Sequence, residues 1–219
     1  MIKSRVRFIL GMVSEIKNII LDWGGIIIGL DENDCIEAFK KIGAPEVAQA
    51  IADGRKNPIF SDFESGRCNT AIFIQTLRAL SPHCTASDKE LAEAWNAMLS
   101  SIPQQRLKKI AELGKHYRIF LLSNTNEIHW LSKIHCWNMV DSDQYSAPED
   151  YFEKIFLSHE LGVMKPDERI YRKVLEMANI QAENTLFIDD NYNNCEVAKE
   201  CGIYAMNVSA LDEVYCVII

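Results

Sequence analysis

The chain has 219 residues, of which 48% are hydrophobic and 25% charged, a composition that suits one large globular domain or a core domain with a smaller companion. Its formal net charge of -8 argues against binding to a nucleic-acid backbone, which normally requires a basic surface. An anionic substrate would therefore need local positive charge, a helix N-terminus or a metal ion.

The cysteines and the first residues indicate a cytoplasmic protein. Seven cysteines are scattered without a C-x-x-C pair, which favours reduced thiols over a disulfide framework. The apolar patch Phe8–Val13 is short for a signal peptide, and Glu15 and Lys17 follow it directly. We expect residues 1–16 to form an N-terminal extension, and no apolar stretch is long enough to span a membrane.

A short apolar run, Ile19–Leu21, is the first predicted strand, and it leads through Asp22 into a tight loop with two glycines. Four segments with helical spacing follow: "DENDCIEAFKKIG", "APEVAQAIADG", "TAIFIQTLRAL" and "SDKELAEAWNAML". The stretch between the second and third, "RKNPIFSDFESGRCN", is rich in turn residues and is predicted to be loop. This pattern indicates a small helical bundle over residues 32–101.

From Pro103 onward, helical and strand patterns alternate. Helices are predicted from Pro103 to Gly114, from Glu127 to Ile134, over "PDERIYRKVLEMANI" and from Asn193 to Cys201. Strands are predicted over "YRIFLLSN", within "KIFLSHELG", and over "TLFIDDN" and "IYAMNV". We therefore expect an α/β protein: a Rossmann-like three-layer α/β/α core with a parallel sheet, formed by residues 17–31 and 102–219, and an inserted helical-bundle cap at 32–101.

Polar residues gather where three of the predicted strands end. They are Asp22, the pair Ser123-Asn124 and the pair Asp189-Asp190. Each alone is compatible with an ordinary loop residue or helix cap. Together they lie at the edge of a parallel sheet where ligands bind, and three neighbouring carboxylates repel one another unless a cation lies between them. Oxygen ligands of this kind suit Mg²⁺.

Two further features indicate chemistry on a phosphoryl group. The Ser123 hydroxyl and nearby backbone N–H groups, beside a predicted helix N-terminus, would form a cradle for an anion. Lys165, which precedes Pro166, would supply the positive charge that the acidic chain otherwise lacks.

Four motifs occur in the order found in one enzyme superfamily: "ILDWGGIII", "LLSNTN", "LSHELGVMKPDERIY" and "LFIDDNYNNCEVAKECGI". From about Asn18 to Val208 the chain resembles the haloacid dehalogenase-like hydrolases. It is most similar to the subgroup that includes bacterial glucose-1-phosphate phosphatases, which share the S-N-T-N, G-x-x-K-P and D-D-N forms.

The resemblance implies a covalent mechanism and a metal site. Asp22 would be the nucleophile and would form an aspartyl-phosphate that water then hydrolyses. A carboxylate oxygen of Asp22 and the backbone carbonyl of Gly24 would help to hold Mg²⁺. Asp190 is expected as the third protein ligand with Asp189 as its close partner, although the sequence leaves the ranking of these two open.

The remaining motifs imply a phosphoryl-binding set. Ser123 and the N–H of Asn124 would bind the transferred group, and Lys165 would offset the charge between that group and Asp22. Most phosphatases of the superfamily carry a general acid at the place of Gly24. Its loss costs about 10²–10⁴-fold in rate, most heavily for poor leaving groups, so we expect anomeric sugar phosphates or aryl phosphates to be affected least.

The sequence thus predicts a Mg²⁺-dependent phosphatase for a small phosphorylated metabolite, with sugar phosphates favoured. Two alternatives stay open: a metal-independent hydrolytic dehalogenase, and a catalytically silent protein that binds a phosphorylated ligand. We expect neither nucleic acid nor membrane as a partner, and a monomer or weak homodimer. Within "IFSDFESGRCN", Phe60, Glu64 and Arg67 could reach over the site, but packing within the bundle and salt bridging is the favoured interpretation of each residue taken singly.

Overall fold

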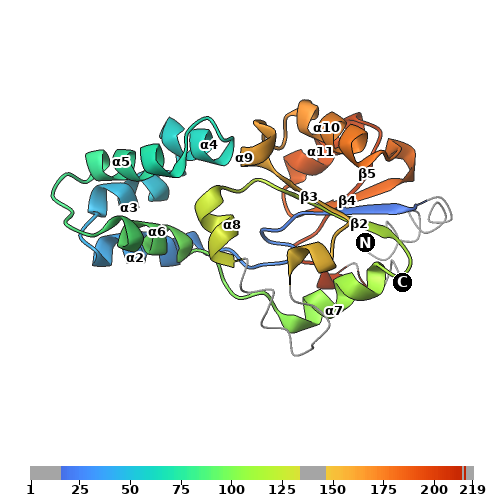
Figure 1. The fold of residues 1–219 in the computed structure, drawn as a ribbon, viewed down its shortest axis with the longest axis horizontal. Helices are drawn as coiled ribbons and strands as arrows, with labels where there is room; N and C mark the ends of the chain where they lie inside the picture. The colour runs from blue at the N-terminus through green and yellow to red at the C-terminus, as the bar shows by residue number, and fades with distance from the viewer. Residues whose placement is uncertain (1–15, 134–146, 214, 216–219) are drawn as a thin grey trace.

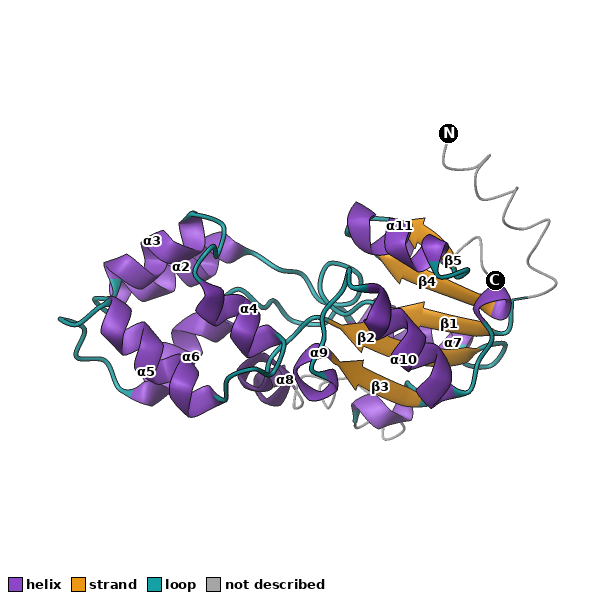
Figure 2. Ribbon diagram, turned by 90° about the horizontal axis from the view of Figure 1, so that it is seen from above, coloured by secondary structure: helices purple, strands orange, loops and turns teal. Residues whose placement is uncertain are grey.

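The structure is a computed structural model that describes residues 16–133, 147–213 and 215. Most of the expected N-terminal extension, residues 1–15, lies outside this description, as does the last residue of the helix predicted to end at Ile134. Five parallel strands form one sheet (Figure 1), in the order β3-β2-β1-β4-β5 (Figure 2). Their bounds are β1 Asn18–Leu21, β2 Arg118–Ser123, β3 Lys154–Leu157, β4 Thr185–Asp189 and β5 Tyr204–Asn207. The predicted parallel sheet is confirmed.

Helices cover both faces of this sheet because the central strands are apolar on both sides. In β1, Ile19 and Leu21 belong to one buried cluster and Ile20 to another. The first cluster is closed by α7 (Gln104–Leu113), and the second by α10 (Glu168–Ala178) and α11 (Tyr192–Glu200). The core is therefore the three-layer α/β/α arrangement that the sequence predicts.

Five helices lie together beyond the carboxyl ends of the strands (Figure 2). We call them the cap helices: α2 Glu32–Lys41, α3 Pro45–Ala52, α4 Pro58–Glu64, α5 Thr70–Leu80 and α6 Asp88–Asn96. The chain leaves the core and returns to it along two adjacent segments, which pair at an antiparallel bridge between Leu30 and Leu99. This insertion after the first strand sets the cap helices over the edge where β1, β2 and β4 end.

Helix α4 corrects the sequence analysis, which assigned its residues to a loop. The side chain of Asn57 accepts the N–H of Ile59 and so caps the helix, and Pro58 occupies the first turn. Ile59, Phe60 and Phe63 are buried on one face. The helix is only 7 residues long and lies between proline and glycine, so its periodicity is too short to read from sequence.

Four short elements complete the core, two that follow strands and two that precede them. Helix α8, Glu127–Lys133, follows β2, and α9, Ser158–Leu161, directly follows β3. The single turns η3, Pro148–Asp150, and η4, Ala182–Asn184, precede β3 and β4. The short α9 helix was not predicted, because only one turn separates the end of the strand from Gly162.

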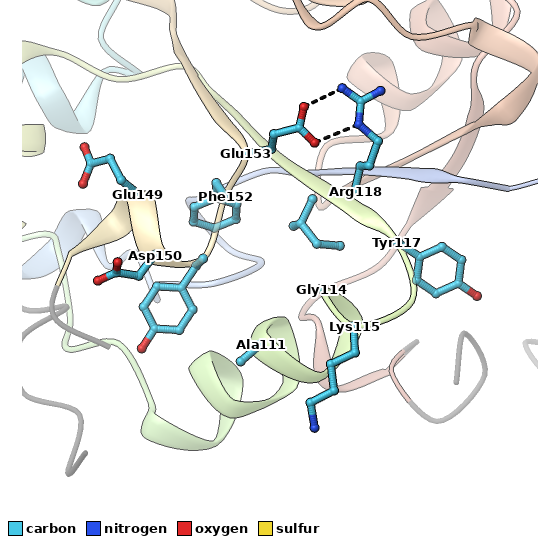
Figure 3. A pocket seen from close by; sticks show the side chains of 11 residues that line it. Ala111, Gly114, Lys115, Tyr117, Arg118, Glu149, Asp150, Phe152 and Glu153 are labelled. Carbon is cyan, nitrogen blue, oxygen red and sulfur yellow. Dashed lines mark hydrogen bonds and ion pairs between the residues drawn. The ribbon is translucent and has the colours of Figure 1, made fainter. Parts of the chain in front are cut away.

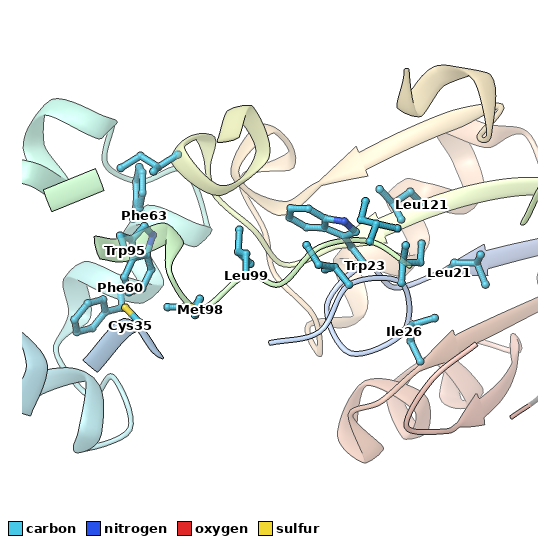
Figure 4. Close-up of a cluster of buried hydrophobic side chains, with 14 of the residues drawn as sticks. Leu21, Trp23, Ile26, Cys35, Phe60, Phe63, Trp95, Met98, Leu99 and Leu121 are labelled. Carbon is cyan, nitrogen blue, oxygen red and sulfur yellow. The ribbon is translucent and has the colours of Figure 1, made fainter. Parts of the chain in front are cut away.

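The apolar interior is continuous from the sheet into the cap helices. Met98 and Leu99 lie between the aromatic residues of the cap and the core residues around Trp23 (Figure 4). Trp95 is fully buried and stacks on Phe60 at 5.5 Å and on His129 of α8 at 4.9 Å between ring centroids. Trp95 therefore joins the cap helices to the core as well as filling the cap interior.

The described cysteines, Cys35, Cys68, Cys84, Cys195 and Cys201, are all free thiols. Across the described ranges, none of the helices combines the length and apolar character needed to cross a membrane.

Replacing Trp95 by alanine tests its packing role. We expect Trp95→Ala to lower the free energy of unfolding by about 3–5 kcal/mol, because a large buried ring is lost and a cavity remains. Ile72→Ala, on the exposed face of α5, is the matched control and should cost less than about 0.5 kcal/mol. Urea unfolding measures both, and equal losses would contradict the assignment of Trp95 as a central contact.

Candidate active site

A buried ion-pair cluster occupies the carboxyl edge of the sheet. The Lys165 ammonium lies 2.8 Å from Oδ1 of Asp22, which follows β1, and 2.6 Å from Oδ2 of Asp189, the last residue of β4. It also donates to the carbonyl oxygen of Leu122 in β2, at 3.1 Å. The lysine side chain is 1% exposed, so it carries its charge inside the protein and needs both carboxylates.

The charged partners decide the protonation state of Lys165. Burial by itself lowers the pKa of a lysine, but the two carboxylates outweigh that effect and hold the pKa of Lys165 above its ordinary value. Burial raises the pKa of the Asp22 carboxyl to about 7, against the opposing effect of the ammonium. A further cation beside Asp22 would lower this pKa again.

The loop that carries Lys165 is held by the side chain of Asn124. The Asn124 amide donates to the carbonyl oxygen of Lys165 at 2.8 Å and accepts its backbone N–H at 2.8 Å. The amide of Asn124 therefore positions the lysine, a role that the sequence did not reveal. The backbone N–H of Asn124 takes no part in these two side-chain contacts. The adjacent Ser123 is buried at the end of β2.

Asp189 has both carboxylate oxygens occupied. In addition to Lys165, it accepts the backbone N–H of Asn191 at 2.7 Å and lies 3.1 and 3.0 Å from the side-chain nitrogen of Asn194. Asn194 is the second residue that sequence reasoning missed, although the asparagine-rich run "DDNYNN" after β4 is a signal for such contacts. Both carboxylate oxygens of Asp189 therefore already have hydrogen-bond partners within the protein.

Asp190, unlike the buried Asp189, is exposed. A Cβ atom added to Gly25 would lie 2.2 Å from Oδ2 of Asp190, so only glycine permits this approach. Gly25 also has a φ of 73°, in the left-handed region that favours glycine. The double glycine after Asp22 predicts a tight loop, but it does not predict the contact between Gly25 and Asp190.

The residues present fit a divalent cation. Carboxylate oxygens of Asp22, Asp189 and Asp190 lie within 4.8 Å of one another. When all are ionised, these three carboxylates exceed the single ammonium of Lys165 by two negative charges. An all-oxygen donor set with this surplus suits Mg²⁺. The carbonyl oxygen of Gly24 accepts the N–H of Ile26 at 2.8 Å, which leaves a second lone pair on that oxygen.

Position 24 has little room for a side chain in this conformation. A Cβ atom on Gly24 would lie 2.7 Å from Cδ1 of Leu30. The Leu30 side chain thus occupies the space into which a general acid at position 24 would extend. Leu30 is 52% exposed, so this obstacle is a movable side-chain end rather than backbone.

Several of the cap residues singled out from sequence lie elsewhere. Phe60 is 2% exposed and belongs to the cap interior, and Arg67 pairs with Asp62 on the surface with its own side chain 60% exposed. Glu64 is also paired: it lies 3.0 Å from Arg55, and its side chain is 16% exposed.

A hollow of about 480 Å³ lies at the opposite end of the sheet from this cluster (Figure 3). It is lined by residues near the start of β2 and β3, among them the ion pair Arg118–Glu153. None of the predicted site residues lines it. The candidate active site is therefore the charged edge next to the cap helices.

The fold and this charged edge fit a hydrolase, and the comparisons agree. The chain belongs to the haloacid dehalogenase-like hydrolase family, whose model matches residues 16–202. D-ribitol-5-phosphate phosphatase of Bacteroides thetaiotaomicron is 29% identical to it over 191 residues, which make up 85% of this chain and 89% of the relative.

Solved structures extend the comparison. A HAD family enzyme from Bacteroides thetaiotaomicron is 38% identical, with a TM-score of 0.81 over 88% of this chain and 93% of that one. Its structures include complexes with magnesium and inorganic phosphate, for the wild type and for an aspartate-to-alanine variant. L-2-haloacid dehalogenase of Xanthobacter autotrophicus is 17% identical, with a TM-score of 0.60 over 88% of this chain and 77% of that one, and shares the fold alone.

These matches confirm the expectations of family, fold, phosphatase activity and Mg²⁺ as the cofactor. The sequence analysis expected the glucose-1-phosphate phosphatase subgroup. The relative found over most of the chain is instead a D-ribitol-5-phosphate phosphatase.

Gly25 offers a test of the site geometry. We expect Gly25→Ala to abolish Mg²⁺-dependent phosphate release, because the added methyl group displaces the Asp190 carboxylate. Gly43→Ala is the matched control, since Gly43 also has a positive φ, of 81°, but nothing lies within 4 Å of an added Cβ. Both variants should lose about 1–2 kcal/mol of stability from backbone strain. Equal activity in the two would contradict the close approach of Asp190.

Proposed function

We propose that this protein hydrolyses the phosphate ester of a small sugar or sugar alcohol, in a Mg²⁺-dependent reaction that passes through a phosphorylated Asp22. The observation that carries the proposal is the Lys165 ammonium buried between Asp22 and Asp189, with Asp190 beside them. The name of the relative, D-ribitol-5-phosphate phosphatase, supports a sugar-alcohol phosphate as the first substrate to test.

In the first step, a carboxylate oxygen of Asp22 attacks phosphorus while the bond between phosphorus and the sugar oxygen breaks. The backbone N–H of Trp23 and the Lys165 ammonium both contact Oδ1 of Asp22, at 2.7 and 2.8 Å, and fix the orientation of the carboxylate. The leaving oxygen takes a proton from water, because Gly24 has no acidic side chain to donate one.

The transferred group is held by the end of β2. The Ser123 hydroxyl and the backbone N–H of Asn124 donate to its oxygens, while Lys165 offsets negative charge. Asp22, Asp190 and the Gly24 carbonyl would hold Mg²⁺, which when bound supplies positive charge that reduces the repulsion between an anionic nucleophile and a phosphate.

In the second step, water attacks phosphorus of the aspartyl-phosphate. The bond to Asp22 breaks, inorganic phosphate leaves, and the free carboxylate is restored. Asp189 serves throughout as the partner of Lys165, because its oxygens are already bonded to Lys165, Asn191 and Asn194.

Other expectations form part of this proposal. Residues 32–101 act as a cap over a catalytic core of 17–31 and 102–219, the protein is cytoplasmic, and it works as a monomer or weak homodimer. The subgroup expected from the motifs makes anomeric phosphates such as glucose 1-phosphate the second class of substrate.

Phosphate release from a panel of D-ribitol 5-phosphate, glucose 1-phosphate and 4-nitrophenyl phosphate tests the function. We expect turnover with Mg²⁺, none with EDTA, and a loss of about 10³-fold or more in kcat for Asp22→Asn, because the amide is a far weaker nucleophile.

Two results would contradict this proposal. Halide release that is insensitive to EDTA would indicate a dehalogenase. Tight binding of phosphate esters by the folded protein without any turnover would indicate a silent binding protein.

The role of position 24 has its own test. We expect the double variant Gly24→Asp/Leu30→Ala to raise kcat for D-ribitol 5-phosphate by about tenfold or more relative to Leu30→Ala alone, because it restores a proton donor in the space that Leu30 now fills. The rate for 4-nitrophenyl phosphate, whose leaving group needs little protonation, should change less. An unchanged ratio of the two rates would show that leaving-group protonation does not limit the reaction.

A further inference from the structure

A charged cluster in the cap helices has no part in the mechanism above. Arg55, after α3, pairs with Glu64 of α4 at 3.0 Å and with Glu32 of α2 at 2.8 Å. The guanidinium therefore bridges three segments of the cap. The side chains of Arg55 and Glu64 remain 33% and 16% exposed, so both can still be reached by a ligand.

The cluster lies on the side of the cap that meets the core. The carbonyl oxygen of Glu64 is 2.5 Å from the Ser158 hydroxyl of α9, and that hydroxyl also accepts the backbone N–H of Thr125 at 2.9 Å. Thr125 comes two residues after Ser123. Glu64 is thus connected through one core side chain to the loop that is proposed to bind the phosphoryl group.

Two further contacts place the same side of the cap against the core. A Cβ atom on Gly66 would lie 2.0 Å from the carbonyl oxygen of His159, so the backbones touch there. Glu32, at the other end of the cluster, follows Asp31, whose N–H donates to the carbonyl of Met98 at 2.8 Å where the two connecting segments run side by side. The cluster therefore extends between two places where cap and core join.

Arg55 adopts a backbone conformation that is rare for its residue type. Its φ is 52°, in the left-handed region that residues with a side chain seldom adopt. The conformation directs the chain from the end of α3 so that the guanidinium lies between the two glutamates. Burial raises the pKa of the Glu64 carboxyl, and the Arg55 charge opposes that rise.

We propose that Arg55 and Glu64 determine substrate specificity by binding hydroxyl groups of the sugar or sugar-alcohol part of the substrate. This inference rests on the proposed phosphatase function. A guanidinium beside a carboxylate offers a donor and an acceptor to one hydroxyl group, which can accept from Arg55 and donate to Glu64. A phosphate ester without hydroxyl groups makes no use of the pair.

The experiment compares Arg55→Asn with Arg67→Asn on D-ribitol 5-phosphate and on 4-nitrophenyl phosphate. Asparagine tolerates a positive φ, so the first variant removes the guanidinium with the least change to the backbone. Arg67 is the matched control, because it is an arginine of the same cap whose side chain is 60% exposed and pairs with Asp62.

For Arg55→Asn we expect kcat/KM for D-ribitol 5-phosphate to fall at least about tenfold, mainly through KM, while 4-nitrophenyl phosphate stays within about twofold of wild type. Glu64→Gln should also lower kcat/KM for D-ribitol 5-phosphate more than kcat/KM for 4-nitrophenyl phosphate. Arg67→Asn should change neither value. The selectivity ratio is a readout that a purely structural role would not alter.

Equal losses on both substrates for Arg55→Asn would overturn the inference and assign Arg55 to cap structure. No loss on either substrate would overturn it as well. Turnover of 4-nitrophenyl phosphate by the wild type separates these results from failure of the proposed function, which would abolish both reactions in every variant including the wild type.

Discussion

The buried ammonium of Lys165 is the interaction on which the site depends. A lysine inside a protein needs opposite charge, and Asp22 and Asp189 supply it at hydrogen-bond distance. The pairing of the adjacent parallel strands β1 and β4 brings the two carboxylates together, and the Asn124 side chain, after β2, holds the loop that carries Lys165. Asn124 and Asn194 then hold the two ends of the arrangement with side-chain amides. Because Asp189 is bonded to Lys165 and Asn194, Asp190 is the exposed carboxylate of the pair, beside Gly25.

The same loop that contributes to the site also contacts the cap. After Ser123 and Asn124, Thr125 meets Ser158, and Asn126 accepts the backbone N–H of His129 at 3.0 Å and lies 3.4 Å from the indole nitrogen of Trp95. Since Ser158 also contacts Glu64, the phosphoryl-binding segment and the cap helices share a continuous set of buried contacts. A substrate bound at its phosphate by the segment after β2 and at its other end by the cap helices would thus contact elements that already touch each other.

Much of the fold and site could be predicted from sequence, because the signals are local. Apolar runs that end in Asp22, Ser123 and Asp189 indicated parallel strands with a polar edge, and the structure joins Asp22 and Asp189 through Lys165. The short helix α4 and the roles of Asn194 and Arg55 could not be predicted. They depend on contacts between segments far apart in the chain, and amide or guanidinium groups carry no periodic signal.

In the proposed mechanism, Asp190 would bind the cation while Asp189 is reserved for Lys165. Calorimetric titration of Mg²⁺ into the wild type and into Asp190→Asn tests it most directly. We expect one Mg²⁺ per chain for the wild type and binding weakened at least about tenfold in Asp190→Asn, because a carboxylate ligand is lost from an all-oxygen site. Equal Mg²⁺ affinity in the two proteins, with both shown to be folded, would contradict it.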